Sequence, residues 1–246
     1  MVKGWKKVKY KNITVYYLEE LDGGGKDRLN DAFTLTVKEL IGKVDTVCEF
    51  CSGPGFIGFS LLAHGLCGKL VLVDVNPKAI DAVNITINKN RLKKKVVAYL
   101  SDALEGVPKN QKWDLAVSNP PHLDGKRTGR KGEVLLNDPG WQIHKRFYAK
   151  VSKHLTEEGS VLFIENGLWS KPKTFKDMIK KNGLTFQKSF PVRFSKFQIL
   201  KTYCNLFNAT RLRKLLTSGG RGLASSYVSS LANDPHFFIW SKKRPS

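Results

Sequence analysis

The sequence has no run of about 18 consecutive apolar residues, so we expect no transmembrane helix. No apolar segment follows the basic residues at positions 1–11, which argues against a secretory signal and makes the cytoplasm the expected location. Hydrophobic residues make up 41% of the 246 residues. That share and that length are enough for one globular domain with a complete core.

Cysteine is scarce, and only Cys48, Cys51, Cys67 and Cys204 are present. Cys48 and Cys51 form a C-x-x-C pair, but a structural zinc site needs two further ligands at paired spacing, and the sequence offers none. The pair also falls where a predicted strand meets a glycine turn. We therefore interpret this pair as small core residues and expect no bound metal.

Acidic residues are few: the chain has 21 Asp and Glu against 42 Lys and Arg, a net charge of +21. Clustered Lys and Arg attract phosphates and release counterions on binding. The charge therefore predicts a nucleic-acid partner, with ribosomal or transfer RNA favoured. The alternative is that the positive charge serves only to keep the protein in solution. No basic amphipathic helix stands out, so we expect no membrane partner.

Strand and helix patterns alternate at short spacing along most of the chain. Residues 6–19 are rich in β-branched and aromatic side chains around a Lys11-Asn12 turn, which predicts a hairpin, and a helix is expected over 31–41. Predicted strands then follow at 44–50, 69–75, 96–100, 113–118, 160–165, 184–190 and 236–240. Predicted helices lie between them at 59–64, 77–90, 141–155 and 174–182. This order predicts an α/β fold with a doubly wound, mostly parallel seven-stranded sheet and an N-terminal β-hairpin.

A glycine loop follows the first apolar strand and opens a helix. It reads Glu49-Phe-Cys-Ser-Gly53-Pro-Gly55-Phe-Ile-Gly58. Glycines allow a tight turn and a close approach of the backbone to a ligand, where a Cβ would clash. The G-x-G-x-x-G pattern suits dinucleotides as well as other adenosine cofactors, and a plain glycine turn is the alternative.

Two aspartates follow the next two predicted strands. Asp74 ends the strand 69–75, where a carboxylate can accept both hydroxyls of a ribose. Asp102 follows the strand 96–100, where it can accept from an adenine N6 amine. Each could instead cap a helix or a turn. Because ligands of doubly wound folds bind beyond the carboxyl ends of the strands, we take both as candidate cofactor ligands.

The strand 113–118 runs directly into Asn119-Pro120-Pro121-His122. Both prolines restrict φ and lack a backbone N–H, so we expect a rigid loop at the end of this strand. A stiff turn without further function is the alternative.

Taken together, these motifs resemble those of class I S-adenosylmethionine-dependent methyltransferases, and the resemblance covers about residues 44–190. The loop 119–122 is similar to the N-P-P-[YFWH] signature of amino-methylating enzymes. The resemblance implies that Glu49 lies near the methionyl amino group of the cofactor, a carboxylate that an NAD-binding loop does not require. The implied cofactor is S-adenosylmethionine, bound by Glu49, Gly53, Gly55, Gly58, Asp74, Asp102 and Asn119.

The same resemblance implies that Asn119, Pro120, Pro121 and His122 carry the chemistry. An exocyclic amine or a side-chain amide is a poor nucleophile because its lone pair is delocalised. The Asn119 side-chain oxygen and the Pro120 carbonyl can both accept from the NH₂ group and align its nitrogen for transfer. The ring at the fourth position can stack on the flat target, and His122 stands where Tyr or Phe is more common.

The predicted organisation is an N-terminal hairpin extension at 1–30 and a methyltransferase catalytic domain at 31–246, with an insertion near 200–233. Two basic segments, 126–131 and 211–221, are candidate contacts to substrate phosphates.

The predicted function is S-adenosylmethionine-dependent N-methylation of an exocyclic base amine, adenine N6 or guanine N2, in RNA rather than DNA. One alternative is a glutamine amide of a release factor or ribosomal protein, a ribosome-associated substrate that a basic enzyme would also suit. A small molecule is another. An NAD-dependent enzyme or a non-catalytic binding module would explain the glycine loop but not the loop 119–122.

Overall fold

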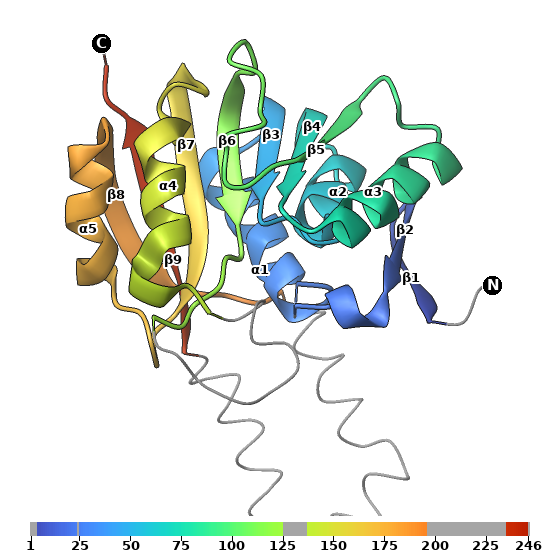
Figure 1. The fold of residues 1–246 in the computed structure, drawn as a ribbon, viewed down its shortest axis with the longest axis horizontal. Helices are drawn as coiled ribbons and strands as arrows, with labels where there is room; N and C mark the ends of the chain where they lie inside the picture. Colours follow the sequence, from blue (N-terminus) through green and yellow to red (C-terminus); the bar gives the residue numbers. More distant parts are fainter. Residues whose placement is uncertain (1–3, 24, 125–136, 196–234, 246) are drawn as a thin grey trace, which may run out of the picture.

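A computed structural model describes residues 4–23, 25–124, 137–195 and 235–245. Its centre is a seven-stranded sheet with the order β5-β4-β3-β6-β7-β9-β8 (Figure 1). The strands are β3 (Val44–Phe50), β4 (Cys67–Asp74), β5 (Val96–Leu100), β6 (Trp113–Ser118), β7 (Leu155–Asn166), β8 (Leu184–Pro191) and β9 (His236–Lys243). Strands β3 to β7 pair in parallel, whereas β9 runs antiparallel to β7 and β8. The predicted fold class is confirmed.

Helices cover both faces of the sheet and bury an apolar layer on each. The helices are α1 (Arg28–Thr36), continued as a π-helix over Val37–Ile41, α2 (Phe56–Ala63), α3 (Pro77–Lys89), α4 (Gln142–Val151) and α5 (Pro172–Lys181). Side chains of α1, α2 and α3 share one apolar cluster, and Phe33 and Phe59 are fully buried in it. Side chains of α4 and α5 form the second cluster, where Phe147 stacks on Phe50. Burial of these apolar side chains on both faces stabilises the packing of the helices on the sheet.

The order of the strands reverses at β3, which lies between β4 and β6. The chain moves outward from β3 to β4 and β5, then returns to β6 on the other side. At such a switch point the loops that leave neighbouring strands diverge and leave a crevice beyond their carboxyl ends. The loops after β3, β4, β5 and β6 carry the residues singled out in the sequence, so the topology brings them to one edge.

The N-terminal hairpin consists of β1 (Trp5–Tyr10) and β2 (Ile13–Leu18). The turn lies at Lys11-Asn12 as predicted, and Lys11 has a positive φ there. Strand β2 lies against α3 rather than against the main sheet. Two side chains from α3 and its C-terminal end form hydrogen bonds with the backbone of β2. Asn90 exchanges hydrogen bonds with Thr14, and Thr86 Oγ1 accepts from the Tyr16 amide. A short 3₁₀ turn, Glu19–Leu21, then leads the chain toward the carboxyl edge of the sheet.

Several predicted boundaries differ from the structure, and two of them have a clear physical reason. Helix α2 begins at Phe56, three residues before the predicted start, because its first turn includes part of the glycine loop. The predicted helix 141–155 ends at Val151, since Leu155 already pairs with Trp113 as the first residue of β7. A second 3₁₀ turn, Pro139–Trp141, precedes α4.

The proposed insertion 200–233 lies outside the described residues, as does the basic segment 126–131. Within the described residues, no helix is both long and apolar enough to cross a membrane.

Candidate functional site

A cavity of about 190 Å³ lies at the carboxyl ends of the central strands. The loops after β3, β4, β5 and β6 all contribute to its wall. Of the residues predicted from the sequence, those that line it are Glu49, Gly53, Asp74, Asp102, Asn119, Pro120, Pro121 and His122. The structure therefore brings together the loop 119–122 and most of the predicted cofactor residues in one cavity.

Gly55 and Gly58 do not border the cavity but lie behind it. A Cβ on Gly58 would meet Leu70 Cδ1 at 2.6 Å and Glu49 Oε2 at 2.8 Å, and a Cβ on Gly55 would meet Leu72 Cδ1 at 2.9 Å. Gly55 also has a φ of +81°, which favours glycine. These two glycines let α2 pack closely against the sheet, so they shape the cavity from behind.

Asp74 connects the glycine loop to the end of β4. Its Oδ2 accepts from the Gly53 amide at 2.7 Å, and its Oδ1 accepts from the Asn76 amide at 2.8 Å. Burial raises the pKa of this carboxyl, and the backbone donors oppose that rise. Each carboxylate oxygen has a second lone pair, so Asp74 can hold the loop and still accept from a ligand hydroxyl.

Glu49 is a buried carboxyl at the floor of the cavity, only 2% exposed. It accepts from the amide of Gly58 at 2.7 Å and from that of Ile57 at 3.4 Å, in the first turn of α2. Burial raises its pKa to about 8 despite these donors. No ion pair of Glu49 with a cationic side chain occurs in the part of the chain that the structure describes. A cationic ligand group beside it would favour its ionised form.

Asp102 lines the same cavity from the loop after β5 but is largely exposed. Its Oδ1 accepts from Arg146 of α4 at 2.8 Å. An adenine amine would have to share this carboxylate with the guanidinium. Arg146 was not singled out in the sequence.

Asn119 and His122 contact each other across the two buried prolines. The Nε2 of His122 lies 3.0 Å from Asn119 Oδ1, and Asn119 Nδ2 donates to the Gly23 carbonyl at 3.4 Å. Behind them, Ser118 Oγ donates to the Phe50 carbonyl at 2.6 Å and ties the end of β6 to β3. The loop 119–122 is thus held from both sides.

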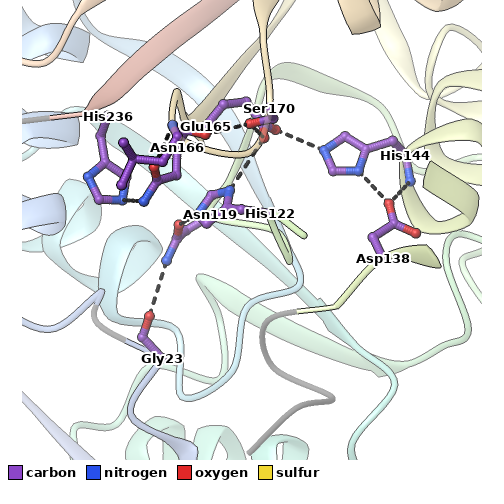
Figure 2. A network of polar contacts seen from close by, with 10 residues as sticks. Gly23, Asn119, His122, Asp138, His144, Glu165, Asn166, Ser170 and His236 are labelled. Atoms are coloured by element: carbon purple, nitrogen blue, oxygen red, sulfur yellow. Dashed lines mark hydrogen bonds and ion pairs between the residues drawn. The ribbon is translucent and has the colours of Figure 1, made fainter. Parts of the chain in front are cut away.

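A network of buried polar side chains continues from His122 toward the second cluster, the one formed with α4 and α5 (Figure 2). Glu165 Oε2 lies 3.3 Å from His122 Nδ1, Glu165 Oε1 lies 2.8 Å from His144 Nε2, and Asp138 Oδ2 lies 2.6 Å from His144 Nδ1. Ser170 Oγ donates to Glu165 at 2.9 Å. Both carboxylates and both imidazoles are less than a tenth exposed.

The charged neighbours of His144 and Glu165 determine the protonation of these two side chains. Burial disfavours the charged form of His144, but Glu165 and Asp138 outweigh it and raise its pKa to about 9. Burial likewise opposes ionisation of Glu165, yet His144 and His122 hold its pKa at about 2. Both groups are therefore charged at neutral pH and form a buried ion pair.

Sequence reasoning missed Glu165 and His144 as site residues. Glu165 did carry a signal, because it follows an apolar run at the end of a predicted strand, as Asp74 does. Asp138 precedes α4 in the sequence, and its carboxylate accepts from the amides of Ile143 and His144 in the first turn of that helix.

The C-x-x-C pair lies in and beside the cavity wall. Cys48 is fully buried, and Cys51 lines the cavity. Burial raises the pKa of both thiols, so neither is a ready thiolate. Among the described residues no group of three or more His, Cys, Asp or Glu side chains is placed to hold a metal ion.

The family model described as "Methyltransferase small domain" matches residues 24–192. A ribosomal protein uL3 glutamine methyltransferase of Francisella tularensis subsp. tularensis is 32% identical over 136 residues, which cover 52% of this chain and 43% of that protein. A ribosomal RNA small subunit methyltransferase C of Haemophilus influenzae is 25% identical over 136 residues, covering 54% of this chain and 39% of that protein. The chain thus spans less than half the length of either relative.

Among solved structures, the T. thermophilus 16S rRNA N2 G1207 methyltransferase (RsmC), in complex with AdoMet and guanosine, superposes with a TM-score of 0.59. The two sequences are 13% identical, and the match covers 98% of this chain and 50% of that one. At this identity the likeness shows a shared fold.

Proposed function

Because the chain belongs to the methyltransferase small domain family, we propose that it methylates a planar NH₂ nitrogen, in the first place an exocyclic amine of an RNA base. Membership of this family confirms the enzyme class predicted from the sequence, a methyltransferase, and supports S-adenosylmethionine as its cofactor. The target of the methyl group, the assignment of the loop 119–122 to amino methylation and the roles of single residues are proposals.

One observation carries the proposal: Asn119, Pro120 and His122 line the same cavity as Gly53 and Asp74. A site that transfers a methyl group must bring the methyl donor and the acceptor nitrogen into contact, and one shared cavity meets that requirement. Separate cavities for the two motifs would have been incompatible with direct transfer.

The lining of the cavity fits S-adenosylmethionine by its chemistry. Glu49 is a buried carboxyl that suits the methionyl ammonium, and Asp74 suits the ribose hydroxyls. Asp102, at the rim, suits the adenine amine. When bound, the cofactor supplies a methyl group on a cationic sulfur.

Asn119 and Pro120 would hold the NH₂ group of the substrate. Asn119 Oδ1 accepts from His122 and has a second lone pair for one substrate hydrogen. The Pro120 carbonyl would accept the other. Two acceptors on one NH₂ fix its nitrogen and stabilise the positive charge that develops there as a methyl group is added.

The net charge of +21 supports RNA as the substrate. A polyanion gains affinity from many weak lysine and arginine contacts, whereas a neutral small molecule does not. An unpaired base in an RNA loop would also avoid most of the cost of flipping a base out of a duplex. The relative from Haemophilus influenzae is named as a ribosomal RNA methyltransferase, which supports this choice.

A glutamine amide of a ribosome-associated protein is the second candidate. The relative from Francisella tularensis is named as a glutamine methyltransferase for ribosomal protein uL3. The amide NH₂ of glutamine is planar like a base amine, so the same pair of acceptors would serve it.

Transfer of a labelled methyl group to total cellular RNA, DNA and protein tests the proposal. We expect label in RNA, and label in protein glutamine would select the second candidate. Label in none of the three fractions, with the cofactor bound by the enzyme, would contradict methylation of a macromolecule.

Asn119→Ala tests the role of the loop. We expect the rate of transfer to fall about 100-fold or more, with cofactor affinity nearly intact, because an acceptor for the reacting group is lost. The exposed Asn110, outside the cavity, gives a matched control as Asn110→Ala, which should retain the wild-type rate. An active Asn119→Ala enzyme would refute the proposed arrangement.

A further inference from the structure

His122 is nearly enclosed in the folded protein. Only 8% of the residue is exposed, and both of its ring nitrogens face oxygen atoms of other side chains. The ring of His236 packs edge-on against it, with 5.8 Å between the centroids. This environment differs from that of an open aromatic platform, which is the role expected for the fourth residue of the loop from the sequence.

The partners of the His122 ring determine where its hydrogens lie. Glu165 also accepts from Ser170 and His144, and an ionised carboxylate can only accept. The His122 Nδ1 that faces it therefore carries a hydrogen. On the other side, the Asn119 NH₂ group donates to the Gly23 carbonyl, so the oxygen end of the amide faces Nε2, and Nε2 must also donate. The low pKa of Glu165 supports this assignment.

This contact has a consequence for Asn119. The two ends of a carboxamide are nearly equal in size, so only hydrogen-bond partners decide which end points where. Here the oxygen end faces the His122 donor, and the NH₂ end faces the Gly23 carbonyl at 3.4 Å. The reversed amide would place oxygen against oxygen at Gly23 and would lose this hydrogen bond.

We propose that His122 is a positioning residue that donates from Nε2 to Asn119 Oδ1 and so fixes the carboxamide with its oxygen available to the substrate NH₂. Glu165 orients the His122 ring for this task from the buried side (Figure 2). The inference rests on the proposed function, because it presumes that Asn119 accepts from an NH₂ group. In this role His122 holds the Asn119 side chain and does not stack on the target.

Three substitutions separate donation from stacking. His122→Gln can place an NH₂ group near the position of Nε2, His122→Asn reaches only as far as Nδ1, and His122→Phe keeps a flat ring without a donor. We expect kcat, measured with labelled S-adenosylmethionine and whichever of total RNA or total protein the wild type labels, to fall about 10- to 100-fold in the Phe and Asn variants. The Gln variant should retain more activity than either, and KM for the cofactor should change little in all three.

His154 provides the matched control. It is a buried histidine that stacks on Trp113 at 4.8 Å and bonds the Gln111 carbonyl at 3.1 Å, at the opposite edge of the sheet from the cavity. His154→Phe makes the same chemical change outside the site, so kcat per folded enzyme should stay at the wild-type level. Full activity of His122→Phe, or a Phe variant more active than the Gln variant, would overturn the proposal in favour of stacking.

A readout without turnover keeps the two proposals distinguishable. In protein labelled with ¹⁵N-histidine, the Nε2 signal of His122, assigned by its loss in His122→Gln, should show a bonded hydrogen. An Nε2 without hydrogen would overturn the positioning role even in an active enzyme. If Nε2 carries the hydrogen and no RNA or protein accepts label, the proposed function fails while the geometry of the pair stands.

Discussion

At the scale of single residues, Glu49 shows how burial can make cofactor binding depend on pH. Its pKa is raised to about 8 in the ligand-free protein, so the carboxyl is mostly protonated at neutral pH. If Glu49 receives the methionyl ammonium, the bound state favours the ionised form, and binding below pH 8 must release a proton. Affinity should therefore rise with pH until the pH passes about 8, and then level off.

Calorimetry with S-adenosylhomocysteine in buffers of different ionisation enthalpy measures both quantities, affinity and protons released. Glu49→Gln, which cannot ionise, should lose the proton release and the pH dependence. An affinity that is flat or falls across the same pH range in the wild type would remove Glu49 from contact with the ammonium.

Asp74 has two tasks, and its loss should weaken both. The side chain holds the Gly53 amide and is proposed to accept from the ribose. Asp74→Ala should weaken binding of S-adenosylhomocysteine about 10- to 100-fold, since a hydrogen bond to a charged group contributes about 1.5–3 kcal/mol. Asp81→Ala, an exposed aspartate on the neighbouring helix α3, serves as the control in the same calorimetric titration. Unchanged affinity in Asp74→Ala would take this residue out of the site.

The sequence predicted residues whose position follows from one strand and the loop after it. Glu49, Asp74 and Asn119 each stand at or next to the carboxyl end of an apolar run, and the topology of a parallel sheet brings such ends together. The contact of His122 with Glu165 could not be found this way, because 43 residues separate the partners and only the pairing of β6 with β7 joins them. A pattern shows which ends are polar but not which polar groups meet.

At the scale of elements, the close packing of α2 against the sheet depends on glycines, which have no side chain to separate the two. Gly58, which the sequence predicts as a cofactor residue, does not border the cavity, and a Cβ added to it would meet Leu70 and the Glu49 carboxylate. The G-x-G-x-x-G pattern serves ligand approach and helix packing with the same residue type, so the pattern could not assign each glycine to one of these tasks. The structure assigns Gly53 to the cavity wall and Gly58 to the packing.

Gly58→Ala tests this division. The added methyl group would lie within 3 Å of Leu70 and Glu49, so either the helix or the carboxylate must move. We expect the free energy of unfolding to fall by about 1–3 kcal/mol, as measured by urea denaturation. Gly68→Ala is the matched control, since a Cβ there meets Asp45 at 3.4 Å, an ordinary contact. Equal stability of the two variants would mean that α2 does not need close approach.

At the scale of the whole molecule, the excess of positive charge is the feature that separates the two candidate substrates. Each phosphate that Lys or Arg neutralises releases a counterion, so the logarithm of the RNA-binding constant falls linearly with the logarithm of salt concentration. The slope is about −0.7 per phosphate for single strands. If the basic surface of this chain tracks an RNA backbone over several phosphates, the slope should be steeper than about −2.

Titration of fluorescent single-stranded RNA at several concentrations of KCl measures that slope, and heparin as competitor shows how much of it any polyanion would give. Substitution of three exposed lysines of α5, Lys173, Lys176 and Lys180, tests whether that face contributes, because each lost phosphate contact lowers the slope by about 0.7. A slope near zero in the wild type would leave the charge without a role in RNA binding. The amide of a protein glutamine would then be the better target, because its recognition needs the acceptors of the cavity and not a polyanion surface.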